Sequence, residues 1–144
     1  MDLIKYKYIR LQRKYSQESI SPIAQCTIKN YREKESGDKQ FKLIEFIRIA
    51  RILGNEVLET TNPKLYEASL YEKYTDIEIE QIIVNELRDY RKKNKLTLKE
   101  MTNDIDGIEM DLSSYSRKEK LKAPFRIDEI EAYYSFFKLN TISE

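Results

Sequence analysis

The sequence predicts an all-α protein. Apolar residues recur at helical spacing along most of the chain, and no segment shows the sustained alternation of apolar and polar residues that a strand would show. The chain is also similar to itself over a long range. Positions 15 to 20 match positions 96 to 101, and positions 28 to 53 match positions 112 to 137. A repeated helical unit accounts for both observations.

The self-similarity pairs apolar residues with apolar residues, as two copies of one packed unit would. The pairs, which we call counterparts, include Ile28 with Leu112, Tyr31 with Tyr115, Phe41 with Phe125, Leu43 with Ile127, and Leu53 with Phe137. We therefore expect two tandem units of four to five helices at 1–58 and 76–144, joined by a partly helical connector at 59–75.

The first half begins with two expected helices. Leu3 to Lys14 is amphipathic, and Ser16 can cap a short second helix that ends at Ile20. Because proline cannot continue a helix but can start one, Ser21–Pro22 is expected to form a tight turn. The apolar stripe of the first helix is expected to consist of Leu3, Ile4, Tyr6, Tyr8 and Leu11.

Two further helices complete the first half, at 24–34 and 40–53. In the first of these, Ile28 and Tyr31 lie three residues apart and are expected to face inward. A polar stretch with Gly37 separates it from the other, which is rich in apolar residues at helical spacing. Gly54 is placed to end that helix.

The second half predicts helices at 77–94, 98–105, 109–118 and 127–139, preceded by a short helix within 65–74. Thr75 or Asp76 is expected to cap the long helix, and Thr97 the one after it. Asp106–Gly107 is expected to form a turn. Pro124 precedes the last helix, which continues to Leu139.

The composition argues against an enzyme, a membrane protein and a secreted protein. No apolar run approaches the roughly 18 residues of a membrane span, and the first residues are too polar for a signal peptide. One cysteine fits a reducing cytoplasm. Without histidine the chain lacks the usual general base and metal ligand, and three glycines cannot build a phosphate-binding loop. We therefore expect no catalytic residues, no metal and no cofactor.

Charge is distributed unevenly, although the whole chain carries only +1. Residues 1–71 hold 13 basic and 9 acidic side chains, a net charge of +4, whereas residues 72–144 hold 13 and 16, a net charge of −3. A surface that binds nucleic acid is therefore expected in the first half.

The order of elements resembles the Cro and lambda-repressor-like helix-turn-helix family, also called the xenobiotic-response-element type. The residues that carry the resemblance are 10–20, 24–32 and 41–54 in the first half, and 87–105, 112–118 and 127–140 in the second. The resemblance implies two divergent copies of this unit. It also implies that the helix near 24–34 enters the major groove of double-stranded DNA, which admits one α-helix.

The outward face of that helix carries side chains that can read DNA. Gln25 and Asn30 can bond adenine, while Lys29 and Arg32 can reach guanine or phosphates. The resemblance implies that Gln25 lies near the first base-reading position, and that the start of the preceding helix contacts phosphate. The predicted DNA-contacting residues are Ser16, Gln17, Gln25, Thr27, Lys29, Asn30 and Arg32.

The two copies depart from each other in two ways. The first lacks three residues between Ile20 and Ile28, so its second helix is expected to be about one turn long. The second copy is acidic over 102–119, with a balance of −3, which opposes binding to a phosphate backbone. Its recognition helix is therefore interpreted as repurposed. Candidates for backbone contacts there are Arg91, Lys92, Lys93, Lys95, Arg117 and Lys118, although a basic run at a helix C-terminus also has a plain structural role.

We therefore expect a sequence-specific transcriptional regulator, a repressor of a phage, plasmid or mobile element that acts in the cytoplasm. The alternative is a helix-turn-helix scaffold that binds a protein, or inhibits a nucleic-acid enzyme, through its acidic second unit. The last helix carries more aromatic residues than one core stripe needs, namely Tyr133, Tyr134, Phe136 and Phe137. They have two possible roles: packing in the chain's own core, or forming a homodimer or inter-domain surface.

Overall fold

The computed structural model describes residues 1–61, 70–103, 105 and 107–142, and it confirms the all-α class. Throughout this described part the regular secondary structure is helical, apart from one isolated bridge between two residues. The elements are α1 (Leu3–Gln12), α2 (Gln17–Ala24), α3 (Ile28–Ser36), α4 (Leu43–Leu53), the 3₁₀ helix η1 (Asn55–Thr60), α5 (Leu70–Lys73), α6 (Asp76–Lys93), α7 (Glu100–Asn103), α8 (Leu112–Glu119) and α9 (Ile127–Ile142).

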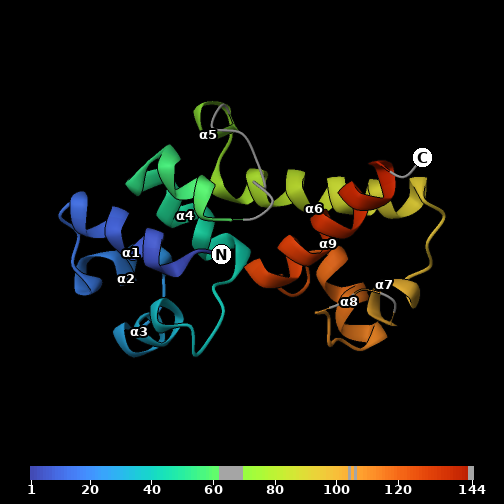
Figure 1. Ribbon diagram of the computed structural model, residues 1–144, viewed down its shortest axis with the longest axis horizontal. Helices are drawn as coiled ribbons and strands as arrows, with labels where there is room; N and C mark the ends of the chain where they lie inside the picture. Colours follow the sequence, from blue (N-terminus) through green and yellow to red (C-terminus); the bar gives the residue numbers. More distant parts are fainter. Residues whose placement is uncertain (62–69, 104, 106, 143–144) are drawn as a thin grey trace.

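The helices form two groups along the long axis of the molecule (Figure 1). The helices α1 to α4 lie at one end and α7 to α9 at the other, while α6 runs along one edge and packs against α4, α8 and α9. None of the described helices is long and apolar enough to cross a membrane. The expected helix within 65–74 is described only from Leu70 onward, and the expected turn at Asp106–Gly107 lies partly outside the described residues.

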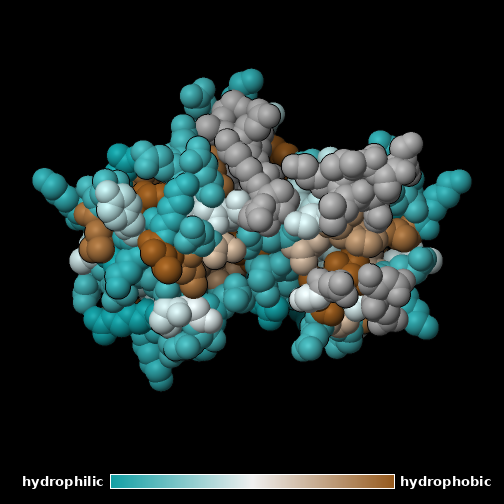
Figure 2. Space-filling view, in the orientation of Figure 1, coloured by the Kyte–Doolittle hydropathy of each residue, from teal (hydrophilic) through white to brown (hydrophobic). Residues whose placement is uncertain are grey.

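The predicted apolar stripe of α1 is largely wrong. Ile4, Tyr8 and Leu11 are 87%, 59% and 56% exposed, whereas Tyr6 and Ile9 are buried. Only one face of α1 packs against α3 and η1, and this face carries Tyr6 and Ile9. Figure 2 shows hydrophobic patches in the hydrophilic surface at the end of the molecule that holds α1.

The predicted turn at Ser21–Pro22 is also wrong, because α2 continues through Pro22 to Ala24. Pro22 lacks the N–H that would bond the Glu18 carbonyl four residues earlier. That carbonyl instead accepts a long hydrogen bond, 3.4 Å, from the Ser21 hydroxyl. The second helix of the first half is therefore two turns long, and the one-turn helix is α7 in the second half.

An aromatic pair is buried at matching positions in each half. The ring of Tyr31 packs on Phe41 with centroids 5.8 Å apart, and Tyr115 packs on Phe125 at 6.1 Å. All four rings are almost fully buried. Tyr31 and Tyr115 are therefore inward as predicted, and with Phe41 and Phe125 they form the centres of the two halves. Ile28, also predicted to face inward, is only partly buried, and its counterpart Leu112 is 48% exposed.

The two tyrosines differ in the partner of their hydroxyl groups. Tyr31 shares a buried hydrogen bond of 2.7 Å with Tyr6. The match of positions 15 to 20 with 96 to 101, extended toward the N-terminus, makes Leu87 the counterpart of Tyr6, and leucine offers no hydroxyl. Among the described residues the buried Tyr115 hydroxyl has no hydrogen-bond partner in good geometry, although burial and the nearby Glu119 carboxylate raise its pKa.

This difference predicts opposite responses to the same substitution. Tyr31→Phe is expected to lower the free energy of unfolding by about 1–2 kcal/mol, because it leaves the Tyr6 hydroxyl buried without a partner. Tyr115→Phe removes a hydroxyl that makes no well-aligned hydrogen bond, so we expect a change within about 0.5 kcal/mol or a small gain. Urea unfolding followed by circular dichroism compares the two. Equal losses in the two variants would show that the hydrogen bond between Tyr6 and Tyr31 adds no stability that Tyr115 lacks.

The aromatic residues near the C-terminal end pack within the chain. Tyr133 and Phe137 are buried, and the hydroxyl of Tyr134 donates to the carbonyl of Ile83 in α6 at 3.1 Å. Phe137 stacks on Tyr90 of α6 with centroids 5.6 Å apart. These contacts agree with one of the two roles expected for these aromatic residues, packing in the chain's own core.

The two halves meet at an antiparallel bridge between Lys42 and Arg126. The Leu43 N–H donates to the Phe125 carbonyl at 2.8 Å, and the Ile127 N–H donates to the Phe41 carbonyl at 2.9 Å. Each of these residues begins α4 or α9 or lies one or two residues before it, and the two helices are themselves in contact.

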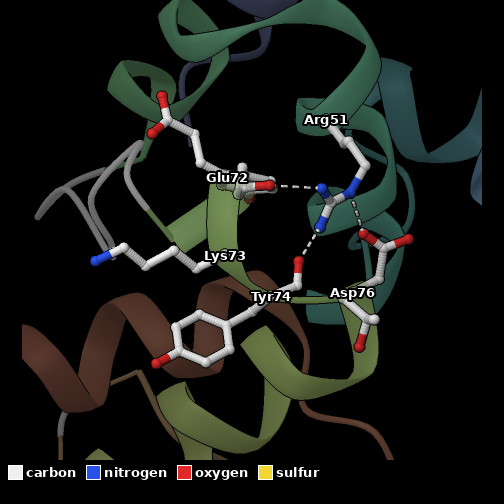
Figure 3. A pocket seen from close by; sticks show the side chains of 7 residues that line it. Arg51, Glu72, Lys73, Tyr74 and Asp76 are labelled. Carbon is white, nitrogen blue, oxygen red and sulfur yellow. Dashed lines mark hydrogen bonds and ion pairs between the residues drawn. The ribbon is translucent and has the colours of Figure 1, made fainter.

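Arg51 anchors the segment that leads into α6 (Figure 3). Its guanidinium donates to the carboxylate of Asp76 at 2.6 Å and to the carbonyls of Tyr71 and Tyr74 at 2.8 and 2.7 Å. It also lies over the Tyr71 ring. A surface pocket lies around Arg51. Because these contacts already occupy the guanidinium, we assign Arg51 a structural role there and not a ligand-binding one.

Candidate nucleic-acid interface

Two buried ion pairs hold the last turn of α3 against the rest of the first half. The Lys34 ammonium donates to the Glu45 carboxylate of α4 at 2.7 Å, and the Arg10 Nε of α1 donates to Glu35 at 2.9 Å. All four side chains are largely buried. Because two adjacent residues are fixed to two different helices, the face of α3 that meets solvent is fixed as well.

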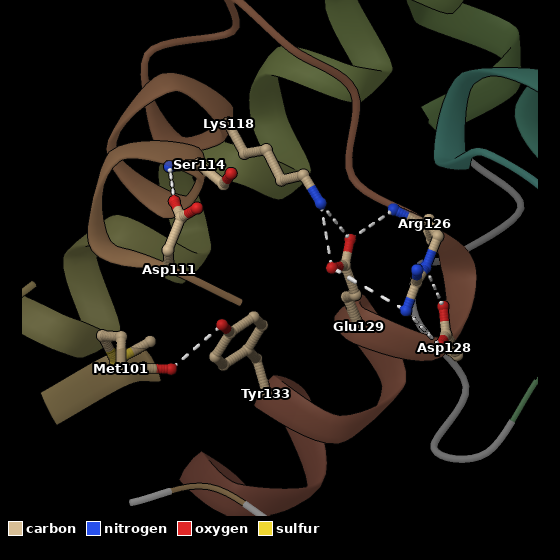
Figure 4. Close-up of polar contacts among 8 residues, drawn as sticks. All are labelled: Met101, Asp111, Ser114, Lys118, Arg126, Asp128, Glu129 and Tyr133. Carbon is tan, nitrogen blue, oxygen red and sulfur yellow. Dashed lines mark hydrogen bonds and ion pairs between the residues drawn. The ribbon is translucent and has the colours of Figure 1, made fainter. Parts of the chain in front are cut away.

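Two equivalent ion pairs occur in the second half, and Figure 4 shows the one between Lys118 and Glu129. The Lys118 ammonium of α8 donates to Glu129 of α9 at 2.8 Å, and Arg91 of α6 donates to Glu119 at 2.7 Å. Glu129 is the counterpart of Glu45, and Arg91 is the counterpart of Arg10. The anchor of α8 therefore has the chemistry of the anchor of α3.

A cluster of polar side chains joins α2 to α3. The Arg32 guanidinium donates to Gln17 at 3.2 Å and to Glu18 at 2.8 Å. Gln17 in turn donates to the buried carboxylate of Glu35 at 2.8 Å. A hydrogen bond at its own backbone and the nearby Arg32 charge lower the pKa of Glu18. Gln17 and Arg32, both predicted DNA contacts, are thus brought together and bonded within the chain.

The helix predicted at 24–34 begins later than expected, and Gln25 does not lie on it. Gln25 ends α2 in a left-handed conformation with φ of 60°, and α3 begins after Thr27. The Thr27 hydroxyl accepts from the Asn30 N–H at 3.2 Å and so sets the start of α3. Gln25 is exposed in the connection between α2 and α3, two residues before the cap Thr27, so its predicted place within a helix at 24–34 is wrong.

The remaining predicted contacts of the first half lie at the exposed ends of α2 and α3. Ser16 caps α2 by accepting from the Ser19 N–H at 3.1 Å. Lys29 is exposed, and no ion pair of its side chain is described. The side-chain oxygen Oδ1 of Asn30 accepts from the Lys39 ammonium at 3.4 Å. Lys39, which follows α3, was not predicted as a site residue, because sequence periodicity assigns a loop residue to no face.

The predicted basic residues of the second half separate into two groups. Arg91 and Lys118 are largely buried in the ion pairs with Glu119 and Glu129, which leaves them little freedom to reach DNA. The exposed ones are Lys92, Lys93, Lys95 and Arg117, to which the structure adds Lys120 and Lys122 after α8.

The acidity counted over 102–119 overstates the negative charge at the surface of α8. Glu119 is buried and paired with Arg91, so it contributes little to the exposed charge. Glu109 and Asp111 are exposed, and Asp111 caps α8 by accepting from the Ser114 N–H at 2.7 Å. That hydrogen bond lowers the pKa of Asp111. The side chains of Asp104 and Asp106 lie outside the described residues.

Neither a metal site nor a similar protein supplies a further clue to function. Among the described residues no group of three or more cysteine and carboxylate side chains is placed to hold a metal ion. Comparison with protein-family models, with curated proteins and with solved structures found no match to this chain.

Proposed function

We propose that this protein is a sequence-specific DNA-binding regulator, a repressor of a phage, plasmid or mobile element, built from two divergent helix-turn-helix units of the Cro and lambda-repressor-like kind. The reading helix is α3, and the protein represses by occupying its operator. The proposal requires no catalytic step and no cofactor, and it has the protein act in the cytoplasm. A partner copy is not needed for the first contact with DNA.

The observation that carries the proposal is the fixed presentation of α3. Buried ion pairs at Lys34 and Glu35 anchor one face of this helix. The other face exposes Lys29 and Arg32, and Arg32 is also bonded to Gln17 and Glu18 of α2. Phosphate contacts from such cations position a protein on a duplex, and side chains at the start of the helix reach base edges. The rigid mounting reduces the conformational entropy lost on binding.

Selection of bound duplexes from a random pool, followed by a polarisation titration, tests the proposal. We expect a defined sequence to emerge, bound on the order of 10³-fold more tightly than random DNA at physiological salt. Affinity should fall linearly with the logarithm of salt concentration. Binding of equal strength to every sequence at every salt concentration would overturn the specific-reader proposal.

Lys29→Ala is expected to weaken binding to all sequences about equally and to reduce the salt slope by about 0.9, the share of one phosphate contact. Lys73→Ala is the matched control. Lys73 is also an exposed lysine, but it lies in α5 on the opposite edge of the molecule (Figure 1). Equal effects of the two substitutions would mean that α3 has no special role in contacting phosphate.

Gln25→Gly separates stability from binding. A non-glycine residue in the left-handed conformation is strained, so glycine is expected to raise the free energy of unfolding by about 0.5–1 kcal/mol. The same change removes the amide, and it should cost about 1–3 kcal/mol of discrimination at one base pair. Thermal unfolding and titration on single-base operator variants measure the two effects. A more stable protein with unchanged discrimination would remove Gln25 from the interface.

One observation favours the alternative of a protein partner. Glu109 and Asp111 lie exposed at the start of α8 beside Leu112, which is 48% exposed. An exposed apolar side chain with exposed carboxylates close to it in the sequence suits a basic protein surface better than phosphates. If the random-pool selection yields no sequence while Leu112→Ser abolishes capture of a co-purified protein, the scaffold function replaces the DNA reader.

A further inference from the structure

The bridge at the junction joins positions that are counterparts of each other. Lys42 is the counterpart of Arg126. The two donors, Leu43 and Ile127, are likewise counterparts, and so are the two acceptors, Phe41 and Phe125. An antiparallel bridge in which each residue pairs with its own counterpart has a local two-fold axis through its centre. The two halves are therefore related by rotation at this point, and not by translation along the chain.

The local two-fold extends from the bridge to α3 and α8. The Glu45 carboxylate accepts from the Lys42 N–H at 2.8 Å and binds Lys34 of α3. The Glu129 carboxylate accepts from the Arg126 N–H at 2.9 Å and binds Lys118 of α8. One carboxylate on each side thus fixes a helix relative to the bridge in the same way. Figure 1 shows α3 and α8 on the same edge of the molecule, at its two ends.

We infer that one chain binds one DNA site as the single-chain counterpart of a symmetric dimer, with α3 and α8 meeting two half-sites in inverted orientation. This inference rests on the proposed function. A duplex has two-fold axes perpendicular to its length, so readers related by a two-fold meet inverted half-sites, whereas readers related by translation meet direct repeats. The bridge within the chain takes the place of a subunit interface.

The two half-sites differ in sequence, because the exposed side chains differ. The counterparts of Lys29 and Arg32 are Ser113 and Ser116. The second half instead carries exposed cations at the end of α8 and beyond, namely Arg117, Lys120 and Lys122. This distribution suits phosphate contacts more than base reading. The site is therefore inverted in geometry and unequal in sequence, with the stronger specificity on the α3 side.

Tethered cleavage of the selected duplex tests the arrangement. Cys26 is replaced by serine, and a single cysteine is introduced at Ser36 or at Lys120, two exposed positions that are counterparts of each other. Each cysteine carries an iron chelate that cleaves nearby DNA. Lys73→Cys on the opposite edge is the matched control and should produce no cuts. Sedimentation of the same complex measures the number of chains per duplex.

We expect one chain per duplex, with the cuts from positions 36 and 120 on opposite strands, at places that a two-fold axis relates and about one helical turn apart. Cuts on the same strand would show direct repeats. Cuts from position 36 alone would show that α8 does not reach DNA, and two chains per site would show a homodimer. Each of these three results overturns the inference and leaves the proposed function intact. Absence of any sequence-specific complex would overturn the proposed function itself.

Discussion

Replacing Arg10 by methionine is expected to lower the free energy of unfolding by about 3–5 kcal/mol, because the change leaves a buried carboxylate without its counter-charge. Arg10 is only 4% exposed, and its guanidinium binds the Glu35 carboxylate and the Tyr15 carbonyl. In the variant, Glu35 would retain only the neutral amide of Gln17. Urea unfolding followed by circular dichroism at helical wavelengths measures the loss.

Two further variants separate the ion pair from packing. Arg10→Met with Glu35→Met removes both charges and should recover most of the lost stability, since an apolar pair can replace a buried ion pair at little cost. Arg91→Met in the second half should cost less than Arg10→Met, because the Arg91 side chain is 14% exposed and water can solvate Glu119 in part. A loss below about 1 kcal/mol for Arg10→Met would contradict this account of the α3 anchor.

Residues whose burial follows from local spacing could be predicted from the sequence. Tyr31 and Tyr115 are inward because a helix that packs on one side buries residues three or four apart. Phe41 and Phe125 are also buried, but they lie two residues before α4 and α9, outside the helices. The all-α class follows from this periodicity. The resemblance to a helix-turn-helix family remains a prediction that rests on the same positions.

Features set by tertiary contacts could not be predicted in this way. Nothing near Ile4 in the sequence shows that α1 meets its neighbours through Tyr6 and Ile9, so the choice of buried face depended on where α3 and η1 lie. Charge counting failed for the same reason. Glu119 counts toward the acidity of the second half in the sequence. In the structure its charge is paired with Arg91, which lies in a different helix, α6.

Phe41→Ala and Phe125→Ala are each expected to lower the free energy of unfolding by about 3–5 kcal/mol. Both rings are almost fully buried and pack against tyrosines. Truncation to alanine leaves a cavity, and the buried ion pairs restrict the movement of the helices that could fill it. Both residues also carry the carbonyls that accept the two hydrogen bonds of the bridge. Phe41→Leu and Phe125→Leu retain most of the volume and should cost clearly less.

The shape of the unfolding curve then reports whether the two halves are one cooperative body. Each half alone is small enough to be marginal, and the bridge, the contact of α4 with α9 and the packing of α6 on α4 tie them together. We therefore expect each alanine variant to shift a single transition that near-ultraviolet and far-ultraviolet circular dichroism both follow. If Phe41→Ala instead produced two transitions, one of them at the wild-type midpoint, the halves would fold independently. A rigid two-fold placement of α3 and α8 would then lose its physical basis, because independent halves would hold no fixed angle between the two helices.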